Sequence, residues 1–223
     1  MLPYFSNQLI VSCQPCVGGP MDNPLIIAAM AQAVVAGGAS GVRIEGVRNV
    51  EAVRSVLKQP IIGIVKVDLE TSPIRITPFL QNIRDLASAG ADIIAVDATD
   101  RPRPETLEAA IQAIKAAGAL SMADCSCIDD GNNAARLGAD ILGSTMAGYT
   151  TDMTPEGPDL ELVRQLATLG KPLIAEGRYH TPALAVEALK AGADAVVVGT
   201  AITRTEVVTG WFFDALKSSE FAR

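Results

Sequence analysis

A lysine and an aspartate interrupt one of the most apolar stretches of the chain. The stretch PIIGIVKVDL (60–69) reads as a buried strand, yet it contains Lys66 and Asp68. A lysine is rarely buried unless it is paired or functional. If burial or a neighbouring cation lowers its pKa, Lys66 could form a Schiff base or act as a general base; otherwise it is a fixed cation. A lysine base with a carboxylic acid suits proton transfer at a carbon next to a carbonyl group.

Polar side chains also end the other apolar runs of the chain. At the C-terminal ends of eight such runs stand Gln14, Arg43 with Glu45, Lys66 with Asp68, Asp97, Asp124, Ser144 with Thr145, Glu176, and Gly199 with Thr200. Any one of these residues could belong to a structural ion pair, but eight polar ends argue for a shared site. The carboxylates among them are the candidate partners of Lys66.

Two loops near the C-terminus have features of a phosphate site. The segment EGRYHTP (176–182) leads into a helix predicted to begin near Thr181, and VGTAITR (198–204) places Arg204 at the start of a short helix. Small residues let backbone N–H groups approach an anion, and helix N-termini attract it. Glycines that only close tight turns would explain either loop alone, but the two together favour a phosphorylated ligand. The candidate residues are Gly177, Arg178, Gly199, Thr200 and Arg204.

Short strands must hold these residues. The eight apolar runs are LIVSCQ (9–14), GVRIEG (41–46), IIGIVKV (61–67), DIIAVDA (92–98), LSMADC (120–125), DILGST (140–145), PLIAEG (172–177) and AVVVGT (195–200). Helical patterns lie between them, for example at 24–38, 77–90, 104–118, 158–170 and 181–192. Many open with Thr, Asp or Pro and close with Gly, as capped helices do. Strands that alternate with helices indicate parallel βαβ units.

A longer repeat indicates that the sheet closes. Gly-Ala-Ser or Gly-Ala-Asp, beginning at Gly38, Gly90, Gly138 and Gly192, precedes every second run, in steps of 52, 48 and 54 residues. We therefore predict an α/β chain with a single (β/α)₈ TIM barrel of the phosphate-binding type, one catalytic domain over 1–223. Active sites of such barrels lie at the carboxyl ends of the strands, and the loops after strands seven and eight often bind phosphate.

Composition restricts the partners and the location. The chain is 49% apolar and 4% aromatic and carries a formal net charge of −7. This balance argues against nucleic acid or an anionic membrane as a partner, but it allows a small anion at one local site. Residues 1–13 have no basic segment followed by an apolar one, and no run suits a transmembrane helix, so a cytoplasmic location is expected.

The cysteines and the histidine do not predict a metal site. Four cysteines accompany one histidine, without the spacing of a zinc finger, so buried or strand-end thiols are the preferred interpretation. His180 lies beside the first phosphate loop and is interpreted as a loop residue rather than a catalyst.

Sequence blocks along nearly the whole chain resemble the N-acetylmannosamine-6-phosphate 2-epimerase family. In order, they are LIVSCQP (9–15), VRIEGV (42–47), IIGIVKVDL (61–69), ADIIAVDATDRPRP (91–104), MADCS (122–126), GSTMAGYT (143–150), IAEGRY (174–179) and VVGTAITR (197–204). The resemblance implies a cofactor-independent isomerase of sialic acid and N-acetylmannosamine breakdown. Such an enzyme interconverts N-acetylmannosamine 6-phosphate and N-acetylglucosamine 6-phosphate by inverting C2 of the open-chain sugar.

The resemblance also implies roles for the candidate residues. Lys66 would be the base at C2, Glu176 its acid partner, and Asp124 the residue that positions or polarises Lys66 and the substrate. Gln14 and Arg43 would bind near the reacting oxygens. Arg178 and Arg204, with the backbone of Gly177, Gly199 and Thr200, would hold the phosphate.

Alternatives remain at this level. Another phosphate-binding barrel enzyme, either a sugar-phosphate epimerase or a lysine-dependent aldolase, would use paired aspartates with a metal or a Schiff-base lysine. A non-catalytic phosphosugar sensor would bind without turnover. The neighbours Trp211, Phe212 and Phe213 should cap the barrel or form a subunit interface, and we expect a homodimer.

Overall fold

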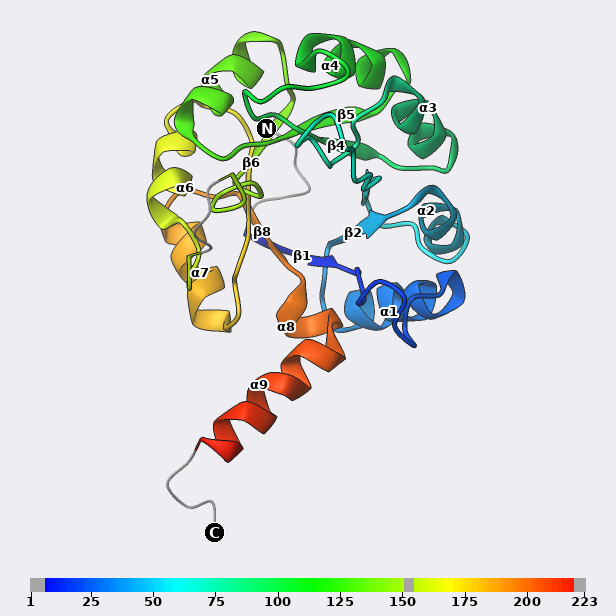
Figure 1. Ribbon diagram of the computed structural model, residues 1–223, viewed down its shortest axis with the longest axis vertical. Helices are drawn as coiled ribbons and strands as arrows, with labels where there is room; N and C mark the ends of the chain where they lie inside the picture. Colours follow the sequence, from blue (N-terminus) through cyan, green and yellow to red (C-terminus); the bar gives the residue numbers. More distant parts are fainter. Residues whose placement is uncertain (1–6, 151–154, 219–223) are drawn as a thin grey trace.

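Eight parallel strands close into a barrel. The computed structural model describes residues 7–150 and 155–218, and within these ranges each strand pairs with the next and β8 with β1 (Figure 1). The strands are β1 Gln8–Ser12, β2 Gly41–Glu45, β3 Ile61–Ile64, β4 Ile93–Asp97, β5 Leu120–Asp124, β6 Ile141–Gly143, β7 Leu173–Glu176 and β8 Ala195–Val198. This arrangement confirms the predicted (β/α)₈ barrel.

Helices surround the barrel and follow the strands. They are α1 Pro24–Ala36, α2 Val47–Arg54, α3 Leu80–Ser88, α4 Leu107–Ala116, α5 Ile128–Arg136, α6 Leu160–Ala167, α7 Pro182–Lys190, α8 Thr200–Thr203 and α9 Thr205–Lys217. Polar side chains start several of them: Thr106, Asp159 and Thr181 accept hydrogen bonds from the first turns of α4, α6 and α7. Of the helices within the described ranges, none has the length and apolar content needed to cross a membrane.

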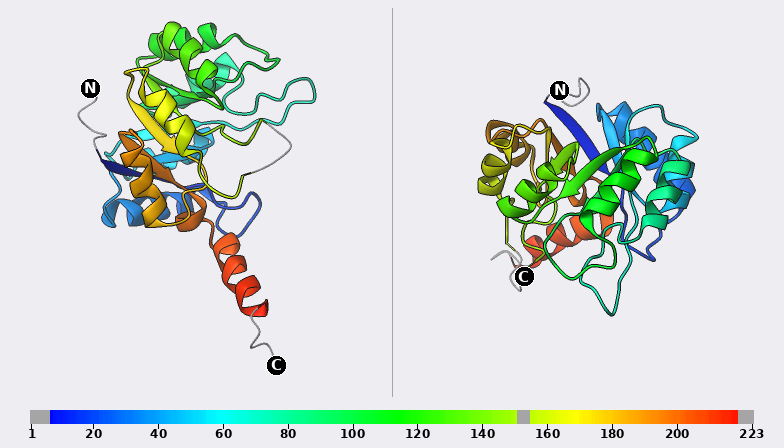
Figure 2. Two further views of the ribbon diagram at one scale, coloured as in Figure 1. Left: turned by 90° about the vertical axis from the view of Figure 1, so that its left-hand side faces the viewer. Right: turned by 90° about the horizontal axis from the view of Figure 1, so that it is seen from above.

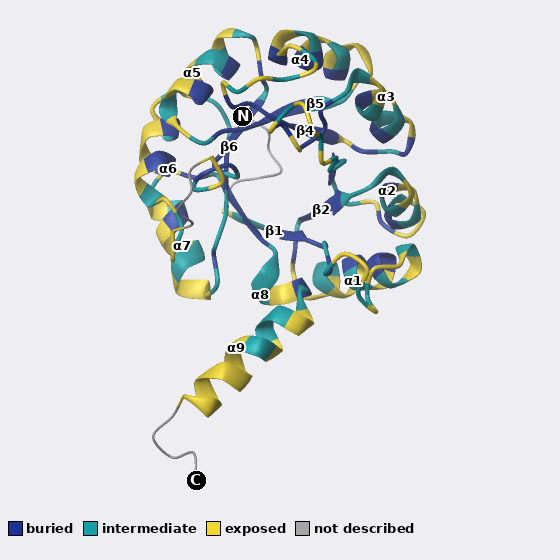
Figure 3. Cartoon of the chain, viewed as in Figure 1, coloured by how far each residue is buried: buried dark blue, intermediate teal, exposed yellow. Residues whose placement is uncertain are grey.

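Strand residues alternate between two buried clusters. Val42 and Ile44 of β2 pack under the surrounding helices, whereas Ile62 and Ile64 of β3 belong to the cluster inside the barrel. Figure 3 shows the strands as the most buried part of the molecule. Because side chains alternate along a strand, Arg43 between two outward-facing residues must point into the barrel.

The Gly-Ala-Asp repeat sets the register of the strand pairs. Each of the aspartates Asp92, Asp140 and Asp194 accepts a hydrogen bond from the backbone N–H at or next to the start of the preceding strand, at 2.8, 2.9 and 2.8 Å. The glycine two residues before each aspartate has a positive φ, which lets the helix end there and the chain turn toward the next strand. The repeat of two βα units is therefore a structural device at the amino ends of the even strands.

The third strand is shorter than predicted. The run 61–67 was expected to be one strand, but β3 ends at Ile64. Beyond it the chain folds back on itself: Val67 N–H donates to the Arg75 carbonyl, and Thr77 N–H donates to the Val65 carbonyl. Lys66 therefore stands in a small hairpin above β3, two residues past the end of the strand.

Helix α9 extends away from the barrel (Figures 1 and 2). Phe212 and Phe213 on this helix are 69% and 55% exposed, and Trp211 is partly exposed. Phe212 and Phe213 therefore do not cap the barrel, so that alternative from the sequence is wrong for these two residues. The other alternative, a subunit interface, stays a prediction.

Candidate active site

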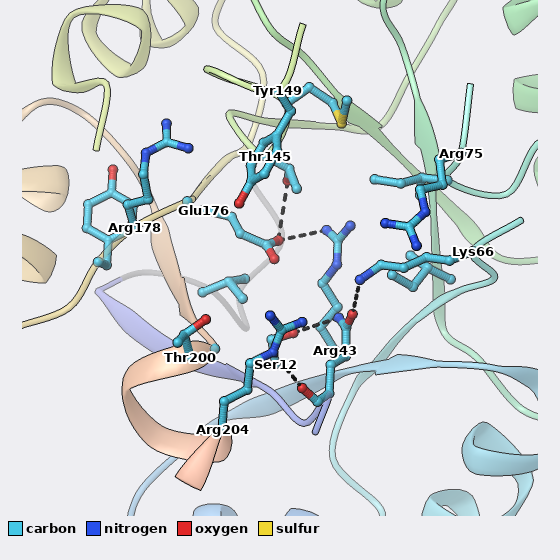
Figure 4. A pocket seen from close by; sticks show the side chains of 18 of the residues that line it. Ser12, Arg43, Lys66, Arg75, Thr145, Tyr149, Glu176, Arg178, Thr200 and Arg204 are labelled. Atoms are coloured by element: carbon cyan, nitrogen blue, oxygen red, sulfur yellow. Dashed lines mark hydrogen bonds and ion pairs between the residues drawn. The ribbon is translucent and has the colours of Figure 1, made fainter. Parts of the chain in front are cut away.

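A cavity of about 450 Å³ opens at the carboxyl ends of the strands (Figure 4). This is the end of the barrel at which the sequence placed the site. Most of the predicted site residues line it, namely Gln14, Arg43, Lys66, Glu176, Gly177, Arg178, Gly199, Thr200 and Arg204. Asp124, the remaining predicted residue, lies buried beneath the cavity.

Arg43 is held between two carboxylates. Its Nη2 lies 2.6 Å from Asp124 Oδ2, and its Nη1 lies 3.2 Å from Asp124 Oδ1 and 2.8 Å from Glu176 Oε2. The side chain is 1% exposed, and burial alone would lower its pKa. The charges of Asp124 and Glu176 outweigh burial and raise the pKa of Arg43 above its ordinary value. A permanent, rigidly oriented cation therefore lies at the floor of the cavity.

Asp124 supports Arg43 rather than meeting Lys66. Besides Arg43, it accepts a hydrogen bond from Thr145 Oγ1 at 2.7 Å. Gly143 on the neighbouring strand makes room for it, since a Cβ there would lie 3.0 Å from Asp124 Oδ1. From the sequence we expected Asp124 to position Lys66. In the structure Asp124 instead contacts Arg43 and Thr145.

The amine of Lys66 contacts Gln14. Lys66 Nζ donates to Gln14 Oε1 at 2.5 Å, and Gln14 Nε2 donates to Ser12 Oγ at 2.7 Å. The pKa of Lys66 is lowered to about 8: burial is the largest cause, the nearby cations Arg43 and Arg204 act in the same direction, and nearby carboxylates oppose the change. A lysine with this pKa is partly neutral near neutral pH, which a general base requires.

The pKa of Glu176 is changed in the opposite direction from that of Lys66. Burial and the charge of Asp124 raise its pKa, while Arg43, Lys66 and a hydrogen bond from Thr145 oppose the rise. A carboxyl group of this kind can hold a proton and act as an acid. The cavity therefore contains an amine shifted toward its neutral form and a carboxyl shifted toward its protonated form, which is the pattern of an acid–base pair.

The loop after β7 is shaped for close approach of its backbone. Gly177 and Arg178 have φ values of 119° and 60°, and nothing stands within 4 Å of the position that a Cβ on Gly177 would take. Arg178 donates to the backbone carbonyls of Ala147 and Gly157, at 2.7 and 2.9 Å, and lies 5.4 Å from the ring centre of Tyr149. Its Nη1 is buried and has no hydrogen-bond partner among the described residues. The bonds to backbone carbonyls thus hold the guanidinium in the wall of the cavity.

The second loop carries a short helix. Gly199 precedes α8, and Arg204 follows it at the start of α9, rather than starting the short helix as the sequence predicted. Arg204 Nε donates to the backbone carbonyl of Gln14 at 3.1 Å, and Thr203 Oγ1 donates to the carbonyl of Ser12 at 2.8 Å. These two bonds fasten the loop after β8 to the end of β1.

Several residues that line the cavity were missed. Arg75, Arg101 and Tyr149 come from loops and not from strand ends. Arg101 and Tyr149 belong to the distinctive blocks DATDRPRP and GSTMAGYT, so the signal was present without an assigned role. His180 also lines the cavity, and its ring lies 4.8 Å from that of Trp211.

Some strand-end residues lie elsewhere. Asp68, one of the candidate partners of Lys66, pairs instead with Arg75 at 2.6 Å. Glu45 and Asp68 line a second cavity of about 220 Å³ that adjoins the first at Lys66.

Cysteine thiols are not gathered into a cluster in the described ranges. Cys13 and Cys125 are buried, and each donates to a backbone carbonyl two residues earlier. Within the same ranges, no group of three or more His, Cys, Asp and Glu side chains is placed to hold a metal ion.

Sequence comparisons find close relatives. Residues 27–218 match a family model that is provisionally described as N-acetylmannosamine-6-phosphate epimerase. Proteins of Actinobacillus pleuropneumoniae serotype 5b and Pasteurella multocida, provisionally named N-acetylmannosamine-6-phosphate 2-epimerase, are each 57% identical over 220 residues. These alignments cover 99% of this chain and 96% of each relative.

Structural comparison agrees over the whole barrel. The N-acetylmannosamine-6-phosphate 2-epimerase from Clostridium perfringens superposes with a TM-score of 0.92 at 38% identity, covering 95% of this chain and 94% of that one. Thiamine phosphate pyrophosphorylase from Pyrococcus furiosus, at 18% identity and a TM-score of 0.62, shares the fold alone.

Proposed function

Because the chain belongs to the family of N-acetylmannosamine-6-phosphate epimerases, we propose that it interconverts N-acetylmannosamine 6-phosphate and N-acetylglucosamine 6-phosphate. The observation that carries the proposal is the acid–base pair in the cavity: burial lowers the pKa of Lys66 to about 8 and raises that of Glu176. Two such groups around one carbon suit removal and return of a proton. Breakdown of sialic acid and N-acetylmannosamine is the setting that this activity implies.

The reaction proceeds at C2 of the open-chain sugar. The C2 proton is acidified by the C1 aldehyde, and the neutral amine of Lys66 takes it. The C–H electron pair then becomes part of a C1–C2 double bond, and negative charge develops on the C1 oxygen. Arg43, fixed as a cation by Asp124, stabilises that charge without having to reorient.

Inversion requires a proton on the other face of C2. Glu176 supplies it while the double-bond electrons form the new C–H bond and the C1 carbonyl is restored. Lys66 is then protonated and Glu176 ionised, and proton exchange with water returns both to their starting states. For the reverse reaction the two groups exchange roles.

Phosphate binding holds the sugar in place. Arg178 and Arg204, with the backbone of Gly177, Gly199 and Thr200, bind the phosphate on the side of the cavity formed by the loops after β7 and β8. This binding lies away from C2, so its energy can orient the sugar over Lys66. Its support is the position of Arg178 and Arg204 in the lining of the cavity and the open space beside Gly177.

Isotope exchange tests this proposal. Purified protein would be incubated with N-acetylglucosamine 6-phosphate in D₂O, with chelator added, and followed by NMR. We expect N-acetylmannosamine 6-phosphate to form and deuterium to enter at C2. No conversion of either phosphosugar would refute the activity. Borohydride trapping of the substrate on Lys66 would instead favour Schiff-base chemistry.

The proposal includes a homodimer built on α9. Helix α9 leaves the barrel with Phe212 and Phe213 exposed, and neighbouring exposed aromatic side chains are typical of a subunit interface. Light scattering should give twice the chain mass, and Phe212→Glu should shift it toward the monomer. A monomer for the unaltered protein would refute the dimer.

A cytoplasmic location completes the proposal. Its support is the substrate: a sugar phosphate is doubly charged near neutral pH and does not cross a membrane unaided. Cell fractionation that found the protein outside the cytoplasm would refute this location.

A further inference from the structure

The loop after β4 is organised around a buried carboxylate. Asp97 Oδ1 accepts hydrogen bonds from the backbone N–H and the hydroxyl of Thr99, at 3.0 and 2.6 Å, and Oδ2 accepts from Arg101 Nη2 at 2.8 Å. Asp97 is fully buried and does not line the cavity. Its two oxygens are therefore occupied in shaping the loop, and the residue that reaches the cavity is Arg101.

Arg101 is held along one edge of its guanidinium. Nε donates to Thr99 Oγ1 at 2.8 Å, and Nη2 donates to Asp97. Within the described residues Nη1 makes no hydrogen bond, and the side chain keeps 22% of its surface exposed. An arginine that served only as a counterion for Asp97 would not need the second bond to Thr99. The bonds fix one edge of the guanidinium, and the residue lines the cavity with Nη1 free of hydrogen bonds to the described residues.

The rest of the loop is fixed as well. Arg103 Nη2 donates to the Asp97 backbone carbonyl at 2.9 Å, and Ser72 Oγ from the neighbouring loop donates to the Pro102 carbonyl at 2.6 Å. Arg103 does not line the cavity. The loop thus presents one preorganised donor, Arg101, at low conformational cost upon binding.

The position of Arg101 in the barrel indicates which part of the substrate it would contact. In the order of the closed barrel, β4 lies opposite β8, whose loop belongs to the phosphate side. For the neighbouring loop after β3, Figure 4 shows Lys66 and Arg75 across the cavity from Arg178 and Thr200. A hexosamine 6-phosphate anchored by its phosphate extends its C1–C2 end toward β3 and β4. That end carries the C1 carbonyl, which Arg43 serves, and the acetamido group on C2.

We propose that Arg101 binds the carbonyl oxygen of the N-acetyl group and so selects N-acetylated hexosamine phosphates. The inference rests on the proposed function and adds a specificity residue to it. The chemistry is complementary, because an arginine only donates hydrogen bonds and an amide oxygen only accepts them. It also gives a role to the DATDRPRP block, which neither the acid–base pair nor the phosphate site uses.

The test separates acetyl recognition from phosphate recognition. For the unaltered protein, Arg101→Gln and Arg103→Gln, one would measure KM and kcat with N-acetylmannosamine 6-phosphate. The inhibition constant of glucose 6-phosphate, which keeps the phosphate but has a hydroxyl at C2, would be measured alongside. Arg101→Gln should weaken use of the acetylated sugar about 10- to 100-fold and change the glucose 6-phosphate constant less than about threefold.

Arg103→Gln is the matched control. It removes a guanidinium that bonds the same aspartate from outside the cavity, so both ligands should be affected less than about threefold. Equal weakening of both ligands by Arg101→Gln, or no weakening of either, would overturn the inference. Should Arg101→Gln fail to fold, Arg101→Lys would be used instead. It keeps the charge beside Asp97 but lacks the planar guanidinium that donates from two edges, so it must show the same selective loss of the acetylated sugar. Failure of the proposed function is a separate outcome: the unaltered protein would not turn over.

Discussion

The two sides of the cavity are built by different means. We call the side proposed for proton transfer the chemistry side; it consists of charged side chains at or just beyond strand ends, namely Arg43, Lys66, Asp124 and Glu176. We call the side proposed for phosphate binding the phosphate side; it consists of two loops and their arginines, namely Gly177, Arg178, Gly199, Thr200 and Arg204. On the chemistry side, burial and the charges of neighbouring groups together change the pKa values of Arg43, Lys66 and Glu176. On the phosphate side, backbone conformation and backbone carbonyls set the geometry.

This difference predicts different responses to substitution. The chemistry side is a coupled network, so removing one member should disturb the others and the fold beneath them. The phosphate side holds its arginines by separate bonds to backbone oxygens, so a loss there should stay local and appear as weaker binding. Substitutions on each side therefore break or sharpen the comparison.

Replacing Lys66 should have the largest effect. Lys66→Ala removes the base, and we expect turnover to fall by about 10²- to 10⁴-fold or more, while phosphosugar binding stays measurable by calorimetry. Lys58→Ala, an exposed lysine outside the cavity, should retain turnover within about twofold. An active Lys66→Ala protein would remove Lys66 from the mechanism and with it the chemistry side as defined here.

The next largest effect should come from breaking the ion pairs of Arg43, and it should appear in the free energy of unfolding. Asp124→Asn leaves Arg43 buried with one carboxylate fewer, and we expect the free energy of unfolding to fall by about 3–5 kcal/mol in urea denaturation. Glu161→Gln breaks an exposed pair with Arg164 and should cost roughly 1 kcal/mol or less. Equal losses in the free energy of unfolding for the two substitutions would mean that the buried ion pairs stabilise the fold no more than an exposed pair does.

The sequence predicted the fold well because its signals are local. Each strand follows from a short apolar run, and the Gly-Ala-Asp repeat reflects bonds such as that from Ile61 N–H to Asp92, within one pair of units. The end of β3 was misplaced because the hairpin that holds Lys66 depends on its pairing with residues 75–77. The interpretation of 1–223 as one catalytic domain stays a prediction.

The site was predicted as a set of residues but not as a set of contacts. Gln14 as the partner of Lys66, and Asp124 as the partner of Arg43, depend on which side chains meet after the barrel closes. Arg43 and Glu176, for example, lie 133 positions apart in the sequence. A periodic sequence pattern cannot predict a contact between two such residues. Arg101 was missed because its orientation comes from a loop bonded to Asp97.

Removing a phosphate-side arginine should have an intermediate effect. Arg178→Ala should raise KM by about 10- to 100-fold and leave kcat within a few-fold, because the lost interaction is the same before and during the reaction. Arg48→Ala, an exposed arginine that does not line the cavity, is the control and should leave KM unchanged. A fall in kcat equal to the fall in kcat/KM would place Arg178 on the chemistry side.

The smallest effect tests whether the two sides are electrically independent. Lys66 must be neutral while Glu176 is protonated, so the pair needs one proton in total, and kcat/KM of the free enzyme should fall as the pH rises through a midpoint near 8, where Lys66 loses that proton. Arg204 belongs to the phosphate side, yet its charge lowers the pKa of Lys66. Arg204→Gln should therefore raise that pKa and move the midpoint upward, by about 0.3 to 1 unit.

The midpoint isolates this coupling from the loss of phosphate binding, which lowers kcat/KM at every pH without moving the profile. Arg103→Gln, which removes a cation outside the cavity, should leave the midpoint in place. An unmoved midpoint in Arg204→Gln would mean that the phosphate side only binds. An upward shift would mean that Arg204 also helps to keep Lys66 neutral. The bound phosphate dianion would then offset the charge of Arg204, and the pH midpoint of the substrate-bound enzyme would lie above that of the free enzyme.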